Sequence, residues 1–191
     1  MAKAALFLTD GFEETEAIAT LDILRRGEVQ VTTVSLTGRE MVDGKHGISV
    51  RADALFEAIE ATKNERGGAF DMLVIPGGTT EYTKHEGLLE LVKRYDEEGK
   101  HLAAICAAPA VFGVAGILNG KKAVCYPGME PWLTGAVIGD RIVETDGHIT
   151  TSKGPATAIF FALKLVEILK GKDIAQKVGN AFLVPLISKA G

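Results

Sequence analysis

Cys106 is the residue of this sequence best suited to nucleophilic chemistry. It lies between an apolar run that ends at Ile105 and a helical pattern that begins at Pro109, with alanines on both sides. A nucleophile held between a strand and a helix needs a tight, strained turn, and small neighbours let the backbones approach that closely. A helix start also favours a thiolate, because its unpaired N–H groups carry partial positive charge. We interpret Cys106 as a reactive thiolate on a nucleophile elbow; the competing interpretation is a small, buried, inert side chain.

Pro76-Gly77-Gly78 follows another short apolar run and could turn backbone N–H groups toward a neighbouring atom. Together, the N–H groups of Gly78 and Ala107 would form an anion hole beside the sulfur of Cys106. The alternative is an ordinary turn at a strand end. The prediction therefore depends on the cysteine lying next to it.

Three acids, Glu13, Glu14 and Glu16, open the first helical pattern. Acidic residues in a first turn complement the helix dipole and cap backbone donors, which is the simplest explanation for all three. Their spacing also allows one of them to face the sheet. A carboxylate beside a thiolate would be repelled, so that glutamate would have to be protonated and donate a hydrogen bond to the sulfur. The pattern does not distinguish which of the three does so.

Tyr126 follows the second cysteine, Cys125, and is either an active-site hydroxyl or an aromatic plug at a strand end. Cys125 alternates away from it and is expected in the core, whereas His148 is expected to face solvent. The four histidines are scattered and no metal-binding spacing occurs, so we predict neither a metal site nor a bound cofactor.

These segments share one rim only if the strands that precede them are parallel. Short apolar runs alternate with helical patterns along the chain, which is typical of a mostly parallel α/β sheet with helices on both faces. In such sheets ligands bind at the carboxyl ends of the strands. The chemistry-bearing segments each follow a predicted strand; these strands cover residues 4–9, 72–75, 102–105 and 123–125.

Helical spacing and stop signals predict the remaining elements. Asp53 is expected to cap a short helix, Asp43-Gly44 and Asp146-Gly147 to form hairpin turns, and Gly67-Gly68 to break the chain. A further strand is predicted over residues 29–36. The longer helices are predicted around residues 17–24, 88–95, 109–118, 155–171 and 174–182, with glycines after most of them.

The composition narrows the class of protein. With 191 residues and 47% apolar content, the chain suits a single domain over residues 1–191. A net charge of −4 and the absence of a basic block argue against dedicated nucleic-acid binding. No apolar run approaches membrane-spanning length, and two cysteines without a secretory signal fit free thiols in a reducing compartment. We therefore expect a cytoplasmic protein.

Four segments in this order resemble the ThiJ/PfpI superfamily, in the branch of the parkinsonism-associated deglycase (DJ-one) and its bacterial relatives. The resemblance runs the whole chain and is carried by the motifs at residues 11–16, 74–78, 104–109 and 151–157. It implies a flavodoxin-like three-layer α/β sandwich, usually a homodimer, with the reactive cysteine at a nucleophile elbow.

The resemblance also assigns roles to individual residues. Cys106 matches the nucleophile, Glu16 the protonated partner, and Gly78 and Ala107 the backbone N–H donors at the sulfur. His46 matches a position where many relatives carry an arginine that reaches across the dimer, which makes it a pocket-rim residue. Tyr126 and Gly77 complete the expected pocket.

Two departures from the family pattern restrict the function. Ala107 stands where peptidase-like members carry a histidine, and a later His-x-Glu pair is missing, which argues against a PfpI-type peptidase and a glutamine amidotransferase. Tyr126 stands where close relatives place a histidine, and a phenol is a poorer base than imidazole near neutral pH.

Three functions follow from these residues. The first is a cofactor-independent cysteine enzyme for 2-oxoaldehydes, either a glyoxalase or a deglycase for methylglyoxal adducts, whose partners are small reactive aldehydes or their adducts. The second is a redox-sensing, stress-protective, chaperone-like protein in which Cys106 oxidises to a sulfinate. The third is a non-catalytic dimeric scaffold with a buried cysteine.

Overall fold

A seven-stranded sheet forms the centre of the protein, in a computed structural model that describes residues 1–60 and 70–189. Neighbouring strands pair in parallel except at one edge, where the two strands that come last in the sequence pair antiparallel. The predicted break at Gly67-Gly68 lies outside the described residues. In spatial order the strands are β10 (Val143–Asp146), β11 (Ile149–Ser152), β7 (His101–Ile105), β6 (Met72–Ile75), β1 (Lys3–Leu8), β2 (Gln30–Ser35) and β5 (Ala54–Leu55).

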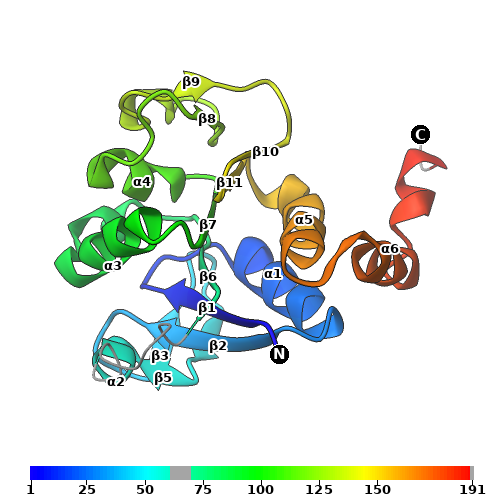
Figure 1. Ribbon diagram of the computed structural model, residues 1–191. Helices are drawn as coiled ribbons and strands as arrows, with labels where there is room; N and C mark the ends of the chain where they lie inside the picture. Colours follow the sequence, from blue (N-terminus) through cyan, green and yellow to red (C-terminus); the bar gives the residue numbers. More distant parts are fainter. Residues whose placement is uncertain (61–69, 190–191) are drawn as a thin grey trace.

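Helices cover both faces of this sheet (Figure 1). On one face α1 (Glu14–Arg26) packs against α5 (Ala158–Lys170), and on the other α3 (Glu86–Glu97) packs against α4 (Pro109–Ala115). All four residues of β6 are buried, as expected for a central strand covered on both sides. The predicted mostly parallel α/β architecture is therefore confirmed.

Smaller elements lie around the sheet. Two short ribbons, β3 (Met41–Asp43) with β4 (Ser49–Arg51) and β8 (Lys122–Ala123) with β9 (Val137–Ile138), stand apart from it. The remaining helices are α2 (Phe56–Glu60) and α6 (Lys172–Ala181), and short 3₁₀ turns span Glu81–Lys84, Glu130–Trp132, Pro155–Thr157 and Val184–Lys189. Among the described residues no helix is both long and apolar enough to cross a membrane.

Most predicted boundaries agree with the structure, and the Asp43-Gly44 and Asp146-Gly147 turns do join antiparallel pairs. The helix predicted to reach residue 118 is shorter. It ends at Ala115, because Gly116 adopts the left-handed conformation with φ of +77° and its N–H bonds back to the last turn.

Three predictions were wrong. Asp53 does not cap a helix; its carboxylate instead accepts the backbone N–H and the hydroxyl of Thr33, each at 2.9 Å. The strand predicted over residues 123–125 covers only Lys122–Ala123 and belongs to the small ribbon with β9, outside the central sheet. His148 does not face solvent: its Nε2 lies 2.7 Å from Oδ1 of Asp96, and only 20% of its side chain is exposed.

Candidate active site

Cys106 follows β7 in a strained backbone conformation, with φ of +65°. Such a conformation is costly for a residue with a side chain and persists only where the surroundings impose it. Here the N–H of Cys106 donates to the carbonyl of Ser152 and its carbonyl accepts from the N–H of Tyr126, both at 2.9 Å. The predicted elbow is present, and the second of these bonds keeps Tyr126 at the rim although its own strand lies outside the sheet.

Gly77 allows the β6 end to approach the elbow closely. A Cβ added at Gly77 would lie 2.6 Å from Cβ of Cys106 and 2.9 Å from the carbonyl oxygen of Ile105, closer than real Cβ atoms come. The N–H groups of Gly78 and Ala107 both hydrogen-bond to the Cys106 sulfur and lower its pKa. The structure thus brings together the two donors that the sequence placed 29 residues apart.

Glu16 is the acid that faces the sulfur. It is fully buried, its Oε2 accepts the N–H of Gly77 at 2.7 Å, and its carboxyl group lies beside the Cys106 thiol, close enough for each to shift the pKa of the other. The other two acids are engaged elsewhere: Glu13 caps α1 by accepting the N–H of Glu16 at 2.7 Å, and Glu14 turns toward His46. The fold therefore settles the choice that local spacing left open.

The Cys106–Glu16 pair resists carrying two negative charges. Burial raises the pKa of Glu16 to about 7, and burial together with the neighbouring Glu16 charge raises the pKa of Cys106 to about 12. Two negative charges are therefore disfavoured at this depth, and near neutral pH the pair carries at most one. A thiolate can form here only while Glu16 keeps its proton, because the second charge would lie beside the first.

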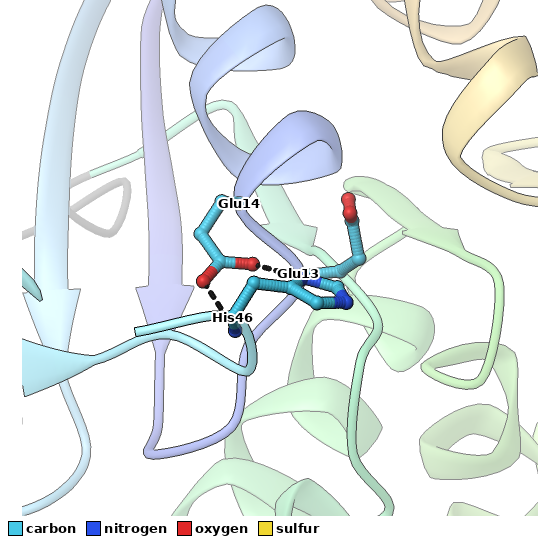
Figure 2. Close-up of side chains that lie close together, drawn as sticks. All are labelled: Glu13, Glu14 and His46. Carbon is cyan, nitrogen blue, oxygen red and sulfur yellow. Dashed lines mark hydrogen bonds and ion pairs between the residues drawn. The ribbon is translucent and has the colours of Figure 1, made fainter. Parts of the chain in front are cut away.

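His46 lies on the loop between β3 and β4 and is held by Glu14 (Figure 2). Its backbone N–H donates to Oε1 of Glu14 at 2.6 Å, and its ring Nδ1 lies 2.8 Å from Oε2. Glu13, Glu14 and His46 each offer a ligand atom within 4.8 Å of the others, a grouping that could hold a metal ion and that the scattered histidines did not predict. The hydrogen bonds that Glu13 and Glu14 make within the protein are enough to explain why these three side chains lie together.

A cavity of about 530 Å³ opens above the sulfur. Its lining includes Cys106, Ala107, Gly78, His46, Tyr126 and Lys45. Gly77, predicted for the pocket, lies beneath the elbow instead. Lys45, whose Nζ donates to the carbonyl of Gly78 at 3.2 Å, carried no signal in the sequence beyond its place beside His46. A larger depression of about 770 Å³ between α5, α6 and β10 is lined by no cysteine, serine, threonine or histidine.

These features define a class: a flavodoxin-like α/β protein with a buried cysteine at a nucleophile elbow and a carboxyl partner. A family model described as the DJ-1/PfpI family matches residues 2–168, so the chain belongs to that family.

Relatives of several kinds share this similarity. The chain is 36% identical to protein dj-1beta of Drosophila melanogaster over 190 residues, covering 96% of this chain and 98% of that one. It is 40% identical to protein DJ-1 homolog B of Arabidopsis thaliana over 187 residues, covering 95% of this chain but only 41% of the longer plant protein. It is 30% identical to a deglycase of Pyrococcus abyssi over 172 residues, covering 88% of this chain and 99% of the relative.

Solved structures agree with the fold. Drosophila melanogaster DJ-1beta superposes with a TM-score of 0.87 at 34% identity, over 95% of this chain and 97% of that one. The oxidized DJ-1 of Toxoplasma gondii gives a TM-score of 0.87 at 36% identity, over 96% and 98% of the two chains.

Proposed function

We propose that this protein is a cofactor-independent cysteine enzyme that acts on 2-oxoaldehydes, as a glyoxalase or as a deglycase of methylglyoxal adducts. The convergence on the Cys106 sulfur of two backbone donors from the cavity lining and of one buried carboxyl group with a raised pKa carries the proposal. The similarity to the Pyrococcus abyssi deglycase supports the same substrate class.

The reaction begins when the Cys106 sulfur attacks the aldehyde carbon. A C–S bond forms, and the carbonyl oxygen takes the electron pair as the alkoxide of a hemithioacetal. The N–H groups of Gly78 and Ala107, which already bond to the sulfur, are placed to donate to this oxygen. Tyr126 faces the same cavity and can donate its phenol proton to a second oxygen.

Glu16 first gives its proton to the hemithioacetal oxygen, and the resulting carboxylate then moves a proton from the aldehyde carbon to the adjacent carbonyl carbon. The first carbon is oxidised to a thioester and the second is reduced to an alcohol, so no external oxidant or reductant is needed. This internal redox balance explains why a site without a cofactor suffices. Water hydrolyses the thioester to a 2-hydroxy acid and releases the thiolate; with methylglyoxal the product is lactate.

The cavity volume bears on the choice between the two activities. At about 530 Å³ it lies within the range of sites that bind drug-sized ligands. It therefore has room for a methylglyoxal adduct as well as for the free aldehyde. A homodimer and a cytoplasmic location belong to the same proposal, because the family resemblance implies the first and the free thiols favour the second.

The test compares lactate formation from methylglyoxal by the wild type, Cys106→Ala and Cys125→Ala. Cys125 is the matched control, since it is also a buried free thiol but is not on the cavity wall. We expect Cys106→Ala to abolish turnover and Cys125→Ala to retain it. Equal turnover by the wild type and Cys106→Ala would refute the proposal.

A redox sensor is the second candidate, in which peroxide oxidises Cys106 through the sulfenate to the sulfinate and is itself reduced to water. The relative from Toxoplasma gondii was solved in an oxidized form, which favours this alternative. The protonated Glu16 and the two backbone N–H groups would donate to the sulfinate oxygens. Both functions use the same thiolate, so they are not exclusive.

A further inference from the structure

The His46–Glu14 pair has the geometry of a base held by a carboxylate. Although burial opposes ionisation, hydrogen bonds from the His46 ring and from backbone N–H groups hold the pKa of Glu14 at about 2. Glu14 is therefore an anion and only accepts hydrogen bonds. The Nδ1 of His46, 2.8 Å away, must donate to it, which leaves the lone pair of the neutral ring on Nε2.

The backbone fixes this pair in place. Gly11 donates to the carbonyl of Asp43 at 2.8 Å and Lys45 to the carbonyl of Phe12 at 2.9 Å, so the β3–β4 loop is bound to the segment that leads into α1. Gly44 has no side chain to displace the carboxylate: a Cβ there would lie 2.7 Å from Cδ of Glu14. The ring orientation is thus set by contacts between segments about 30 residues apart.

The free nitrogen of the ring is turned away from the carboxylate that holds the ring. Figure 2 shows it pointing away from Glu14, on the same side as Glu13, and His46 lines the cavity that contains Cys106 and Tyr126. The His46 side chain is 63% exposed, so Nε2 is accessible to water entering the cavity mouth. By contrast, Glu16 is fully buried and is not part of the cavity lining; its Oε2 accepts the N–H of Gly77 beneath the elbow.

We propose that His46 is the catalytic base of thioester hydrolysis and that Glu14 is its positioning residue. The inference rests on the proposed function, which requires water to attack the acyl group on Cys106. Nε2 removes a proton from the water as its oxygen bonds to the acyl carbon. The C–S bond then breaks, the sulfur leaves with the electron pair as the thiolate, and the proton on Nε2 passes to solvent.

This assignment supplies the imidazole that the sequence lacks beside the sulfur. Tyr126 occupies the position where close relatives place a histidine, and a phenol is a poorer general base near neutral pH. Glu13 lines the cavity too, but its Oε2 caps the N–H of Glu16. His46 reaches the same cavity from a different element, 80 residues away from Tyr126 in the sequence.

The test separates formation of the acyl-enzyme from its hydrolysis. His46→Ala is expected to lower steady-state lactate formation from methylglyoxal by about 10²-fold, the usual effect of losing a general base. The first turnover should persist, so mass spectrometry should find an adduct of one methylglyoxal on Cys106 that the wild type clears. Added imidazole should restore part of the rate, and Glu14→Gln should lower the rate because it no longer fixes the tautomer.

His148→Ala is the matched control, because His148 is also paired with a carboxylate, Asp96, but lies beside the opposite end of the sheet from Cys106. It should keep the wild-type rate. Wild-type turnover by His46→Ala, or a loss with neither adduct nor imidazole rescue, overturns the role of His46 and leaves the proposed function standing. Failure of the wild type to form either adduct or lactate overturns both.

Discussion

Replacing Glu16 with glutamine should remove a pH dependence from the stability of this protein. Glu16 is fully buried, and burial raises the pKa of its carboxyl group from 4.5 to about 7. Glutamine keeps the shape and the carbonyl oxygen that accepts the N–H of Gly77 at 2.7 Å, but it has no charge to bury. The substitution therefore isolates the cost of ionising this site.

The sign and size follow from proton linkage. Between pH 4.5 and about 7 the folded chain keeps the Glu16 proton that the unfolded chain has released. The stabilisation from this group is fully present below pH 4.5 and is lost as the pH rises through about 7. Each pH unit in this window corresponds to about 1.4 kcal/mol, so the wild type should lose about 3 kcal/mol relative to Glu16→Gln.

The assay is urea unfolding followed by circular dichroism at closely spaced pH values from acid to slightly alkaline. Glu90→Gln, on the exposed side of α3, is the control and should follow the wild type. The slope should persist in a Cys106→Ala background, because burial is its largest cause. A constant difference between the wild type and Glu16→Gln across the window would show that Glu16 does not retain its proton, and the reasoning would fail.

Two further predictions concern the thiol. Gly77→Ala places a Cβ 2.6 Å from Cβ of Cys106, so it should destabilise the fold by about 1–3 kcal/mol and change the rate at which Cys106 is alkylated. Gly179→Ala is the control, because its added Cβ would have its nearest neighbour 3.4 Å away, and it should change neither the stability nor the alkylation rate. Equal behaviour of the two variants would contradict the close approach of Gly77 to Cys106. Mild peroxide should add two oxygens to Cys106 well before Cys125, because Cys106 lines the cavity. If mass spectrometry finds both cysteines oxidised at the same rate, Cys106 is not a selectively reactive thiol.

The local sequence pattern was sufficient to predict most helices and strands and the tight turn at Cys106. The apolar run of β6 predicts a buried strand, and the i, i+3, i+4 spacing in α3 predicts its buried face, because both depend on neighbours close in sequence. The small residues around Cys106 predict a tight turn for the same reason. Its φ of +65° is the backbone strain that such a turn entails.

Long-range contacts account for what the pattern predicted wrongly. Asp53 resembles a helix cap until Thr33 is brought beside it by the pairing of β2 and β5. His148 resembles a solvent-exposed turn residue until Asp96, 52 residues away, lies next to it. Each of these outcomes depends on which strands become neighbours, and the sequence of a single segment does not reveal that pairing.

The sequence by itself determined the alternation of strands and helices, indicated Cys106 as the candidate nucleophile, and limited the candidate partners to three acids. The family resemblance pointed to Glu16 and His46, but only the tertiary structure decided that Glu16 rather than Glu13 or Glu14 faces the sulfur, that Glu14 faces His46, and that His46 shares a cavity with Cys106. The physical reason is distance along the chain. Propensity and periodicity act over a few residues, whereas burial and charge at a site are set by segments that only the folded sheet brings together.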